Sequence, residues 1–493
     1  MLKYLPITFF LIFFAHVASA MHYYVTSASG INGTTWKAGD TIVMRNAKWI
    51  NQSIEFKGNG TELNPVVLIA QTPGEVILSG SSSLSVSGSY LEISGLCFKA
   101  GTLSGKDIIS FRTSSTSEAE NCTLKNTAVI SCNPSDKAIE NKWVSIYGKN
   151  NTVSNCSFVN KTNMGTLLVV WLENDVVPNH TIENNYFGYR NANLDNTGKE
   201  LNGQEIIRIG DSHTSMQTAG VKVTGNYFED CNGETEIISN KSCGNYYSNN
   251  IFVGCKGTLT LRHGNNCIVD GNYFIGNGIS NTGGVRIIGE NHKVYNNYFE
   301  DLKGTDFRSA ICMVRGKENS VPNEYFQVKN ALVAFNTMID CSQSFSINYN
   351  NSTCTMPPVG SLIACNVVYN NSASSESKIN VRIEKTKVTE MDVQWKNNFM
   401  NAGKYENFTF SSVEVNADIN PMMKYGGTKT MLYEPDAGTG LSGYTTSDFP
   451  EITVDIRGRD RTSQKLPGAS QVSGKPSRFV PQKNLVGASF IKH

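Results

Sequence analysis

The sequence predicts an all-β protein with the fold of a parallel β-helix, a single elongated solenoid domain that carries a C-terminal extension. Three observations support this prediction. A short phrase that begins with asparagine recurs along most of the chain, it returns every 22 to 25 residues in the middle, and 43 glycines accompany few helical patterns. A period in the low twenties with short β-rich segments is typical of a parallel β-helix.

The recurring phrase is an asparagine followed by a pair of aromatic or aliphatic residues. It occurs at Asn185, Asn226, Asn250, Asn272, Asn297, Asn336, Asn366 and Asn398. Asparagine tolerates the left-handed turn conformation, so we expect it to stack at one corner, its amides bonded along the stack and the following aromatic pointing inward. A β-sandwich or propeller would instead show strands about 8–12 residues apart or repeats near 40 residues.

The chain divides into three expected segments. Residues 1–20 combine one early positive charge, a short apolar run and an Ala18-x-Ala20 ending, which fits a cleavable secretory signal peptide. A membrane anchor is the alternative, but a span needs about 20 apolar residues and this run is shorter. Residues 21–410 would form the β-helix domain with its N-terminal cap, and residues 411–493 an extension packed on it. The mature chain would be periplasmic or secreted, without a membrane span.

Charge and cysteine content narrow the expected partners and chemistry. The 43 Lys and Arg balance 42 Asp and Glu, which gives no reason to expect nucleic acid but allows a local basic groove for a polyanionic sugar. Of twelve cysteines, four are spaced by twelve residues, so Cys231 would lie under Cys255 and Cys243 under Cys267. We expect mostly reduced, buried thiols rather than disulfides.

Two carboxylates and a lysine are concentrated between Asn232 and Lys241. Glu234 and Glu236 are two apart, so on a strand both point outward while Thr235 and Ile237 face the interior. Two like charges side by side are unfavourable unless a cation lies between them, and calcium prefers such oxygen ligands. A solvated pair of surface glutamates is the alternative.

An arginine follows the lysine at about one coil's distance. Arg262 lies 21 residues beyond Lys241, and alternation places Leu259 and Leu261 inside with Arg262 outside. The two cations should therefore meet on adjacent coils. A lysine beside an arginine and a dication gives up its proton more readily, as a general base requires. Alone, Lys241 is equally consistent with an ordinary surface lysine.

The phrase Asn-Gly-Glu-Thr-Glu-Ile-Ile-Ser-Asn-Lys-Ser at 232–242, with Leu-Arg-His-Gly at 261–264, resembles polysaccharide lyase family 6. This family holds alginate lyases and chondroitinase B, built as right-handed parallel β-helices, and the resemblance covers nearly all of the mature chain. It implies that Lys241 is the Brønsted base and that Arg262 takes the position assigned to the acid.

The resemblance also implies a metal site and substrate contacts. Glu234, Glu236 and Asn202 would ligate Ca²⁺, since Asn202 precedes Arg208 by six residues in a phrase that ends Ile-Arg-Ile-Gly. Arg208 and His263 would contact the substrate. Not every member needs calcium, so the resemblance supports the lysine more strongly than the metal.

An acidic polysaccharide, alginate, is the expected partner. Arg286 in Gly-Gly-Val-Arg-Ile-Ile-Gly resembles the substrate-facing arginine of alginate-cleaving members, where chondroitinase B has an apolar residue. Chondroitinase B also reads a sulfate with an arginine in a later loop, and here residues 341–357 contain no arginine or lysine. Dermatan sulfate is the alternative substrate. The expected reaction is β-elimination, in which Lys241 takes the C5 proton while Ca²⁺ and arginine neutralise the uronate carboxylate.

Two other function classes remain open at this point. An inverting glycosidase would use Glu234 and Glu236 as acid and base, about 6.5–9.5 Å apart, but would leave Lys241 and Arg262 without a role. A non-catalytic carbohydrate-binding solenoid would cut no substrate. The sequence does not distinguish mannuronate from guluronate, endo from exo action, or one oligomeric state from another.

Overall fold

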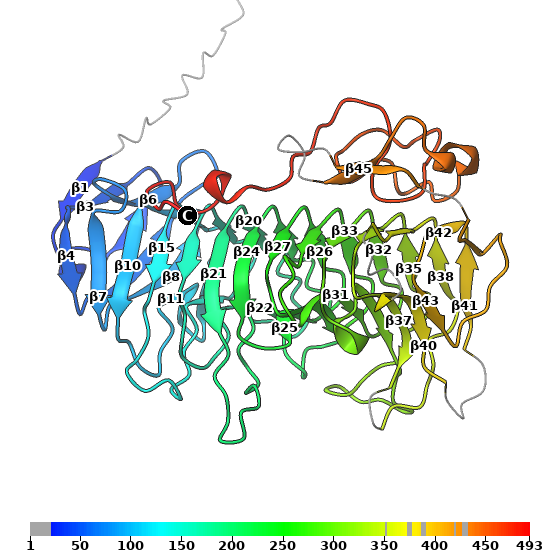
Figure 1. The fold of residues 1–493 in the computed structure, drawn as a ribbon. Coiled ribbons are helices and arrows are strands. Elements are labelled where there is room, and N and C mark those ends of the chain that lie inside the picture. The colour runs from blue at the N-terminus through cyan, green and yellow to red at the C-terminus, as the bar shows by residue number, and fades with distance from the viewer. Residues whose placement is uncertain (1–20, 351–352, 372–376, 386–390, 419–420, 426–431) are drawn as a thin grey trace, which may run out of the picture.

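The computed structural model describes residues 21–350, 353–371, 377–385, 391–418, 421–425 and 432–493. The expected signal peptide, residues 1–20, lies outside this part. The described chain winds into a long solenoid with its coils stacked from the N-terminal to the C-terminal end (Figure 1). In this part of the chain no helix is long and apolar enough to cross a membrane.

Strands of successive coils pair in parallel to form three long sheets. Sheet I has 14 strands: β1 (His22–Val25), β3 (Thr41–Met44), β6 (Val66–Ala70), β9 (Leu91–Ser94), β14 (Thr123–Lys125), β17 (Thr152–Ser154), β20 (Thr181–Glu183), β23 (Lys222–Thr224), β26 (Tyr246–Ser248), β29 (Ile268–Asp270), β32 (Lys293–Tyr295), β35 (Leu332–Ala334), β38 (Ser361–Ala364) and β41 (Val393–Lys396).

Sheet II also has 14 strands: β4 (Ala47–Ile50), β7 (Val76–Gly80), β10 (Leu96–Gly101), β15 (Ala128–Ile130), β18 (Ser157–Val159), β21 (Tyr186–Asn191), β24 (Tyr227–Asn232), β27 (Ile251–Val253), β30 (Tyr273–Ile275), β33 (Tyr298–Glu300), β36 (Thr337–Ile339), β39 (Val367–Tyr369), β42 (Asn398–Met400) and β44 (Val415–Asn416).

Sheet III has 16 strands: β2 (Thr35–Lys37), β5 (Ser53–Asn59), β8 (Ser83–Ser89), β11 (Ile109–Ser110), β12 (Arg112–Ser114), β13 (Ser117–Glu120), β16 (Val144–Ile146), β19 (Leu168–Val170), β22 (Ile207–Ile209), β25 (Glu236–Lys241), β28 (Gly257–His263), β31 (Thr282–Ile287), β34 (Ile311–Val314), β37 (Gln343–Tyr349), β40 (Ile379–Ile383) and β43 (Lys404–Glu406).

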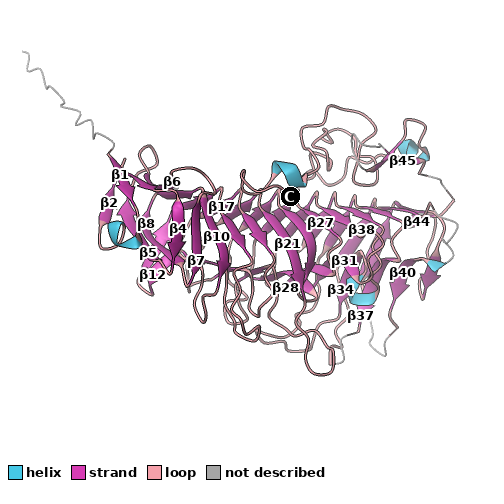
Figure 2. Ribbon diagram, turned by 60° about the vertical axis from the view of Figure 1, so that its left-hand side comes forward, coloured by secondary structure: helices cyan, strands magenta, loops and turns pink. Residues whose placement is uncertain are grey.

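Helical turns are short and few (Figure 2). Among the described residues, the 3₁₀ segments with defined bounds are η1 (Ala28–Gly30), η2 (Asp306–Arg308), η4 (Gly440–Tyr444) and η5 (Lys483–Leu485). A separate antiparallel pair joins β45 (Met423–Tyr425) to β46 (Tyr433–Pro435). A typical coil gives one strand to each sheet, as β23, β24 and β25 do. The predicted parallel β-helix is therefore confirmed.

The recurring asparagines form a ladder inside the corner between sheets I and II. From Asn185 to Asn398, each side-chain Nδ2 donates to the Oδ1 of the next at 2.9–3.0 Å. The left-handed residue is the one before the ladder asparagine, such as Asn249 at φ 51° or Gly271 at φ 66°. Stacking was predicted correctly, whereas the turn conformation belongs to the preceding position.

The two aromatics of the phrase face opposite ways. The second one points inward, and Phe187, Phe228, Phe252, Phe274 and Phe299 stack with ring centroids 4.6–4.9 Å apart. The first one lies on the outer face of sheet II, under the C-terminal extension. The expectation that the residue directly after asparagine points inward is thus wrong by one position, because side chains alternate along each short strand.

All twelve cysteines lie in the described chain, and all are free and buried. The backbone N–H of Cys231 points at the sulfur of Cys255, 3.4 Å away, as the spacing predicted. Cys243 does not lie under Cys267: its sulfur accepts from the N–H of Asn265 at 3.2 Å. The pairing of β26 with β29 aligns Cys267 with residue 245 instead.

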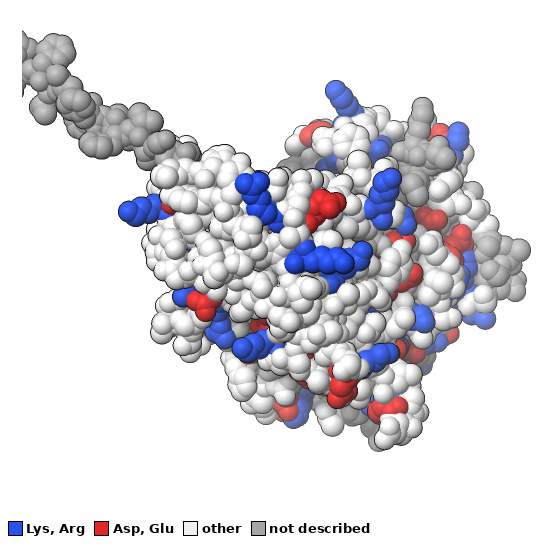
Figure 3. All heavy atoms as spheres, turned by 90° about the vertical axis from the view of Figure 1, so that its left-hand side faces the viewer, with Lys and Arg blue, Asp and Glu red and all other residues white. Residues whose placement is uncertain are grey.

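The N-terminal end of the solenoid is covered by η1 and β2. The indole of Trp36 on β2 is buried in the main core, and β2 pairs only with β5. Figure 3 looks onto this end, where Lys and Arg stand apart among uncharged surface. Charged side chains at such an end oppose edge-to-edge association of strands.

The C-terminal segment runs back along the outer face of sheet II (Figure 1). Leu441, Ile456 and Leu466 pack with the outward tyrosines Tyr273 and Tyr298. The division expected at residue 410 stays a prediction.

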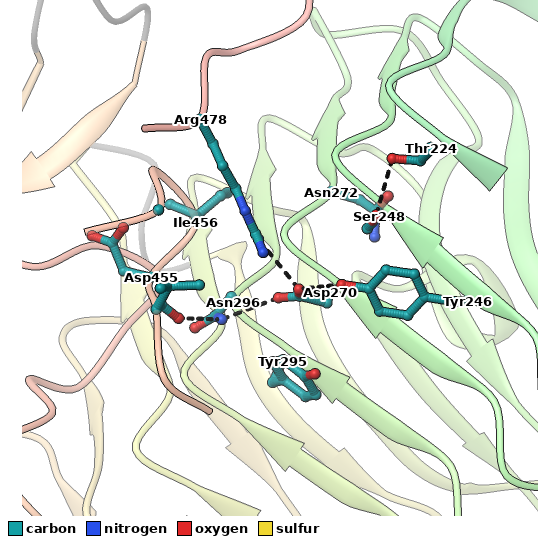
Figure 4. A network of polar contacts seen from close by, with 12 residues as sticks. Thr224, Tyr246, Ser248, Asp270, Asn272, Tyr295, Asn296, Asp455, Ile456 and Arg478 are labelled. Carbon is teal, nitrogen blue, oxygen red and sulfur yellow. Dashed lines mark hydrogen bonds and ion pairs between the residues drawn. The ribbon is translucent and has the colours of Figure 1, made fainter. Parts of the chain in front are cut away.

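Polar contacts also fasten this segment to sheet I. Arg478 pairs with Asp270 at 3.2 Å, and Asp270 also accepts from the hydroxyl of Tyr246 at 2.8 Å and from Asn296 at 3.1 Å (Figure 4). The carboxylate of Asp270 is thereby held between the solenoid and the extension.

The last residues reach the early coils. The N–H of Ser489 donates to Asn126 at 2.7 Å, the N–H of Ala488 donates to Ser157 at 2.8 Å, and the ring of His493 stacks on Tyr186 with centroids 3.6 Å apart. The extension therefore spans most of the length of sheet II.

Candidate active site

The residues singled out from the sequence gather on the outer face of sheet III, on β22, β25, β28 and β31. Arg208 of β22 pairs in register with Ser239 of β25, which pairs with Thr260 of β28, which pairs with Arg286 of β31. Four neighbouring coils thus present one row of outward side chains. The predicted inward positions Leu259 and Leu261 are fully buried.

The acid pair lies where β25 begins, and regular alternation fails there. A β-bulge separates Glu236 from Ile238 in the pairing with β28. Thr235, expected to face the interior, points outward, since its hydroxyl accepts from Arg308 at 2.9 Å and it lines the same cavity as Glu234 and Glu236. That expectation was wrong because a bulge re-aims the side chains around it.

Glu234 lies in an environment that disfavours its negative charge. Burial, followed by the charges of Glu205 and Glu236, raises the pKa of Glu234 to about 9. Its Oε2 accepts from the N–H of Gly203 at 3.2 Å, while its buried Oε1 has no hydrogen-bond partner among the described residues. A hard cation with oxygen ligands fits this orphaned atom and this crowding of acids.

Asn202 reaches the acid pair from a loop before β22. The neck of this loop is closed by Gln204, whose side chain accepts from the N–H of Asn193 at 2.8 Å and donates to Leu201 at 2.7 Å. Asn202, Glu234 and Glu236 all line one cavity of about 430 Å³. Two carboxylates and an amide could hold a cation here, although no cluster of three His, Cys, Asp or Glu with metal-binding geometry occurs in the described chain.

Lys241 is the last residue of β25, and its backbone lies next to Gly210 on the preceding coil. Gly210 has φ +77°, and a Cβ there would lie 2.5 Å from the carbonyl oxygen of Lys241, so only glycine fits. The half-buried Lys241 side chain makes no hydrogen bond or ion pair with any described residue. Its amine is therefore not engaged by another described side chain.

Arg262 lies beside Lys241 through a second bulge. Asn240 pairs with Leu261 and Lys241 with His263, so Arg262 is the extra residue of β28. The predicted meeting of the two cations across adjacent coils follows from this register.

The guanidinium of Arg262 is held on several sides. It donates to the carbonyls of Glu324 at 3.2 Å and Asn323 at 3.3 Å, lies 4.1 Å from the ring of Tyr325, and its Nε is 4.0 Å from Glu236. All three loop residues come from the segment that follows β34.

His263 is buried beneath the two cations, with 1% of its surface exposed. Burial, then the charges of Arg262 and Lys241, lowers the pKa of His263 to about 3, so the imidazole is neutral. Its Nδ1 lies 3.3 Å from Arg262, and its Nε2 has no partner in the described chain.

The two remaining arginines differ in their partners. Arg286 is ion-paired with Glu236 and lies 5.7 Å from the ring of Phe307, at the wall between the 430 Å³ cavity and a neighbouring one of about 190 Å³. Arg208 lies 5.1 Å from the ring of Trp171, and its buried Nε has no partner among the described residues. Unlike Arg286, Arg208 forms no ion pair with a described carboxylate.

Comparison with known proteins decides the family. A family model described as chondroitinase B matches residues 27–433. The chain belongs to the chondroitinase B family. The family resemblance inferred from the sequence is confirmed. No match was found among curated proteins.

Solved structures of family 6 lyases share the fold. The alginate lyase AlyGC is 30% identical with a TM-score of 0.80, over 96% of this chain and 59% of AlyGC. The present chain thus spans about three fifths of that enzyme. A mannuronic acid-specific family 6 lyase from human gut microbiota is 26% identical with a TM-score of 0.71, over 81% of this chain and 92% of that one. A family 6 alginate lyase in complex with a trisaccharide, 22% identical with a TM-score of 0.69, shows the likeness of fold.

Sequence reasoning missed the aromatic side chains that lie against the arginines. Trp171, Phe307 and Tyr325 each lie against a guanidinium, and Phe307 also lies 4.9 Å from Arg308. Each lies outside the Asn-aromatic ladder, and Trp171 and Tyr325 are far in sequence from their arginines. Only Trp171 has a sequence signal. The phrase Trp171-Leu172 directly follows a strand that aligns with β22, the strand of Arg208.

Proposed function

We propose that this family 6 lyase cleaves alginate by β-elimination. The observation that carries the proposal is Lys241, which has no hydrogen-bond or ion-pair partner among the described residues: it ends the strand that Glu236 begins and lies beside Arg262 in the pairing with β28. A solved family 6 structure named as an alginate lyase, and another named as a mannuronic acid-specific lyase, support the choice of reaction.

The residues of this chain would divide the reaction as follows. The C5 hydrogen of a uronate is weakly acidic because its removal spreads charge onto the carboxylate. Lys241 takes this proton, and the guanidinium of Arg208 faces the carboxylate. Arg262 neutralises charge beside Lys241 rather than giving up its own proton, since a guanidinium holds it above about pH 12. The C4–O bond then breaks, the leaving oxygen takes a proton from water, and a 4,5-unsaturated sugar remains.

Calcium fits the acid side of the site. Asn202, Glu234 and Glu236 would hold it, because Oε1 of Glu234 is buried without a described partner and the three side chains line one cavity. A bound Ca²⁺ would stabilise the negative charge that develops on the uronate carboxylate.

Alginate is favoured over dermatan sulfate by the charges around the cavities. Arg286 lines both cavities and can face a carboxylate. Residues 341–357, the segment corresponding to the sulfate-reading loop of chondroitinase B, contain no arginine or lysine. A polymer whose charge is carboxylate alone suits this set.

We also propose that the chain is exported and acts in the periplasm or outside the cell. The support is the sequence of residues 1–20, with its early lysine, apolar run and Ala18-x-Ala20 ending.

Ultraviolet absorbance tests the function directly. The purified mature protein is incubated with alginate, poly-mannuronate, poly-guluronate and dermatan sulfate, because each elimination creates an absorbing double bond. We expect absorbance to grow on an alginate substrate and Lys241→Ala to slow it by about 10²- to 10⁴-fold, the usual contribution of a general base.

The control is Lys293→Ala, a lysine on sheet I that is paired with Glu451 far from the site and should keep full activity. Growth on dermatan sulfate alone would replace the proposed substrate. A flat trace on all four polymers would refute the lyase proposal.

A further inference from the structure

One polar residue interrupts the apolar inner face of sheet III. The inward row that passes through Ile209, Asn240, Leu261 and Ile287 is aliphatic except for Asn240, which has no exposed surface. The coils before and after show that an aliphatic side chain fits this row. The asparagine occurs only on the coil that carries Lys241, directly before it.

The amide of Asn240 is fully bonded. Its Nδ2 donates to the carbonyls of Ser242 at 2.9 Å and His263 at 2.8 Å. Its Oδ1 accepts from Asn245 at 2.7 Å and from the hydroxyl of Tyr247 at 2.7 Å. Buried polar groups satisfied in this way hold one conformation, because any displacement leaves a donor or acceptor unpaired in a dry interior.

The two carbonyls lie on either side of the reaction centre. Ser242 directly follows Lys241 on one coil, and His263 directly follows Arg262 on the next. Between the two coils lies the bulge that makes Arg262 the extra residue of its strand. One side chain inside the solenoid therefore ties together the two strand ends whose outer faces carry the lysine and the arginine.

Tyr247 is the second exceptional residue. Its row in sheet I runs through Val223, Tyr247, Val269 and Val294, so among these four a hydroxyl occurs only on β26, the strand that directly follows the strand of Lys241. Tyr247 has no exposed surface, and its hydroxyl donates to Asn240. Asn240 and Tyr247, each the polar residue of an otherwise aliphatic row, thus contact each other inside the solenoid, behind the proposed base Lys241.

We propose that Asn240 and Tyr247 form an internal positioning pair that sets the spacing and direction of Lys241 relative to Arg262. Neither residue touches the substrate. Their effect passes through the carbonyls of Ser242 and His263, which fix the strand ends at the bulge. This inference rests on the proposed function, in which Lys241 is the base.

The test compares kcat, KM and melting temperature for Asn240→Leu and Tyr247→Phe. Leucine matches the next residue in the row, so the core stays filled while both donors are lost. We expect kcat to fall by about 10²-fold for Asn240→Leu, because displacement of a catalytic group by about 1 Å can have this effect. KM should stay within about twofold, since Arg208 and Arg286 are untouched.

Tyr247→Phe removes one hydroxyl and keeps the ring, so it should fold even if Asn240→Leu does not. We expect its kcat to fall by about tenfold, the equivalent of one hydrogen bond at this site, again at constant KM. The matched control is Asn297→Leu, because Asn297 is an equally buried asparagine of the ladder that donates to Val269 and Tyr295 at 2.9 Å. It should lower the melting temperature and leave kcat unchanged.

Wild type and Lys241→Ala are measured in the same series. If wild type is inactive, the proposed function fails, and this inference fails with it. If wild type is active while Tyr247→Phe and any folded Asn240→Leu keep kcat within about twofold, the pair is only part of the core and the inference is wrong. A rise in KM at constant kcat would also overturn it.

Discussion

The same coils form the corner between sheets I and II and the outer face of sheet III, but the corner is regular and the face is irregular. At the corner, asparagine amides and phenylalanine rings repeat at constant spacing, coil after coil. On sheet III, two bulges interrupt the register within β25 and β28, and the side chains of Lys241 and Arg208 have no hydrogen-bond or ion-pair partner among the described residues. The corner gains stability from repetition, whereas the candidate active site on sheet III depends on departures from it.

The largest expected effect comes from breaking the repeating side. Phe252→Ala should lower the free energy of unfolding by about 3–5 kcal/mol, because it opens a cavity in the middle of the ring stack. Denaturant midpoints with a constant slope would measure this loss, and kcat per folded molecule should be unchanged. A large fall in kcat without loss of stability would show that the two sides are not separate.

The corner between sheets III and I should contribute acid sensitivity. Burial lowers the pKa of His292 to about 4, and its Nδ1 accepts from the N–H of Cys267 at 3.2 Å. The folded-state pKa lies below the unfolded value near 6.5, so this stabilisation is complete above pH 6.5 and is lost as pH falls toward 4. Over that window the loss amounts to about 3 kcal/mol.

The measurement for His292 is the free energy of unfolding at pH 7 and pH 4.5. His292→Asn should lower stability at pH 7 but lose less on acidification than wild type. Equal pH dependence in the two proteins would assign the acid sensitivity to other groups.

A somewhat smaller effect is expected from calcium on the sheet III side. Calcium at about 100 times its dissociation constant should stabilise wild type by about 2.7 kcal/mol, seen as a higher melting temperature, and should leave Glu234→Gln unshifted. Glu118→Gln is the matched control, since burial also raises the pKa of Glu118, to about 7, outside the cavity of Glu234. If wild type does not respond to calcium, the proposed metal site is wrong.

The smallest effect should come from the ring behind Arg208. Trp171→Leu removes a cation–π contact of about 1 kcal/mol, so KM for the polymer should rise by about five-fold while kcat changes little. Trp171→Phe keeps an aromatic ring and should retain most of the affinity. Equal KM values in all three proteins would mean that Arg208 needs no such support.

The regular side of the molecule could be predicted from the sequence, since a repeat imposes the same contacts on each coil. The asparagine spacing indicated the solenoid, and the 21-residue interval from Lys241 to Arg262 placed them on adjacent coils. The ladder asparagines and Cys231 under Cys255 follow from the same period.

The irregular side could not be read in this way. Whether Thr235 points outward depends on a bulge against the next coil, and a period carries no information about where one extra residue is inserted. The contacts of Arg262 with Asn323 and Tyr325 come from a loop about 60 residues away that packs by tertiary contact. The role proposed for Asn240 needs its inward direction, which a polar residue in a strand does not reveal.

The tail that returns along sheet II changes how such a molecule can come apart. A stack of coils that touch only their neighbours can fray from either end, one unit at a time. Here Ser489 and His493 contact the coils of Asn126 and Tyr186. One returning segment therefore contacts coils that lie far apart in the stack. Unfolding that starts at one end of this span therefore has to release contacts at the other, so the returning segment couples distant coils into one cooperative unit.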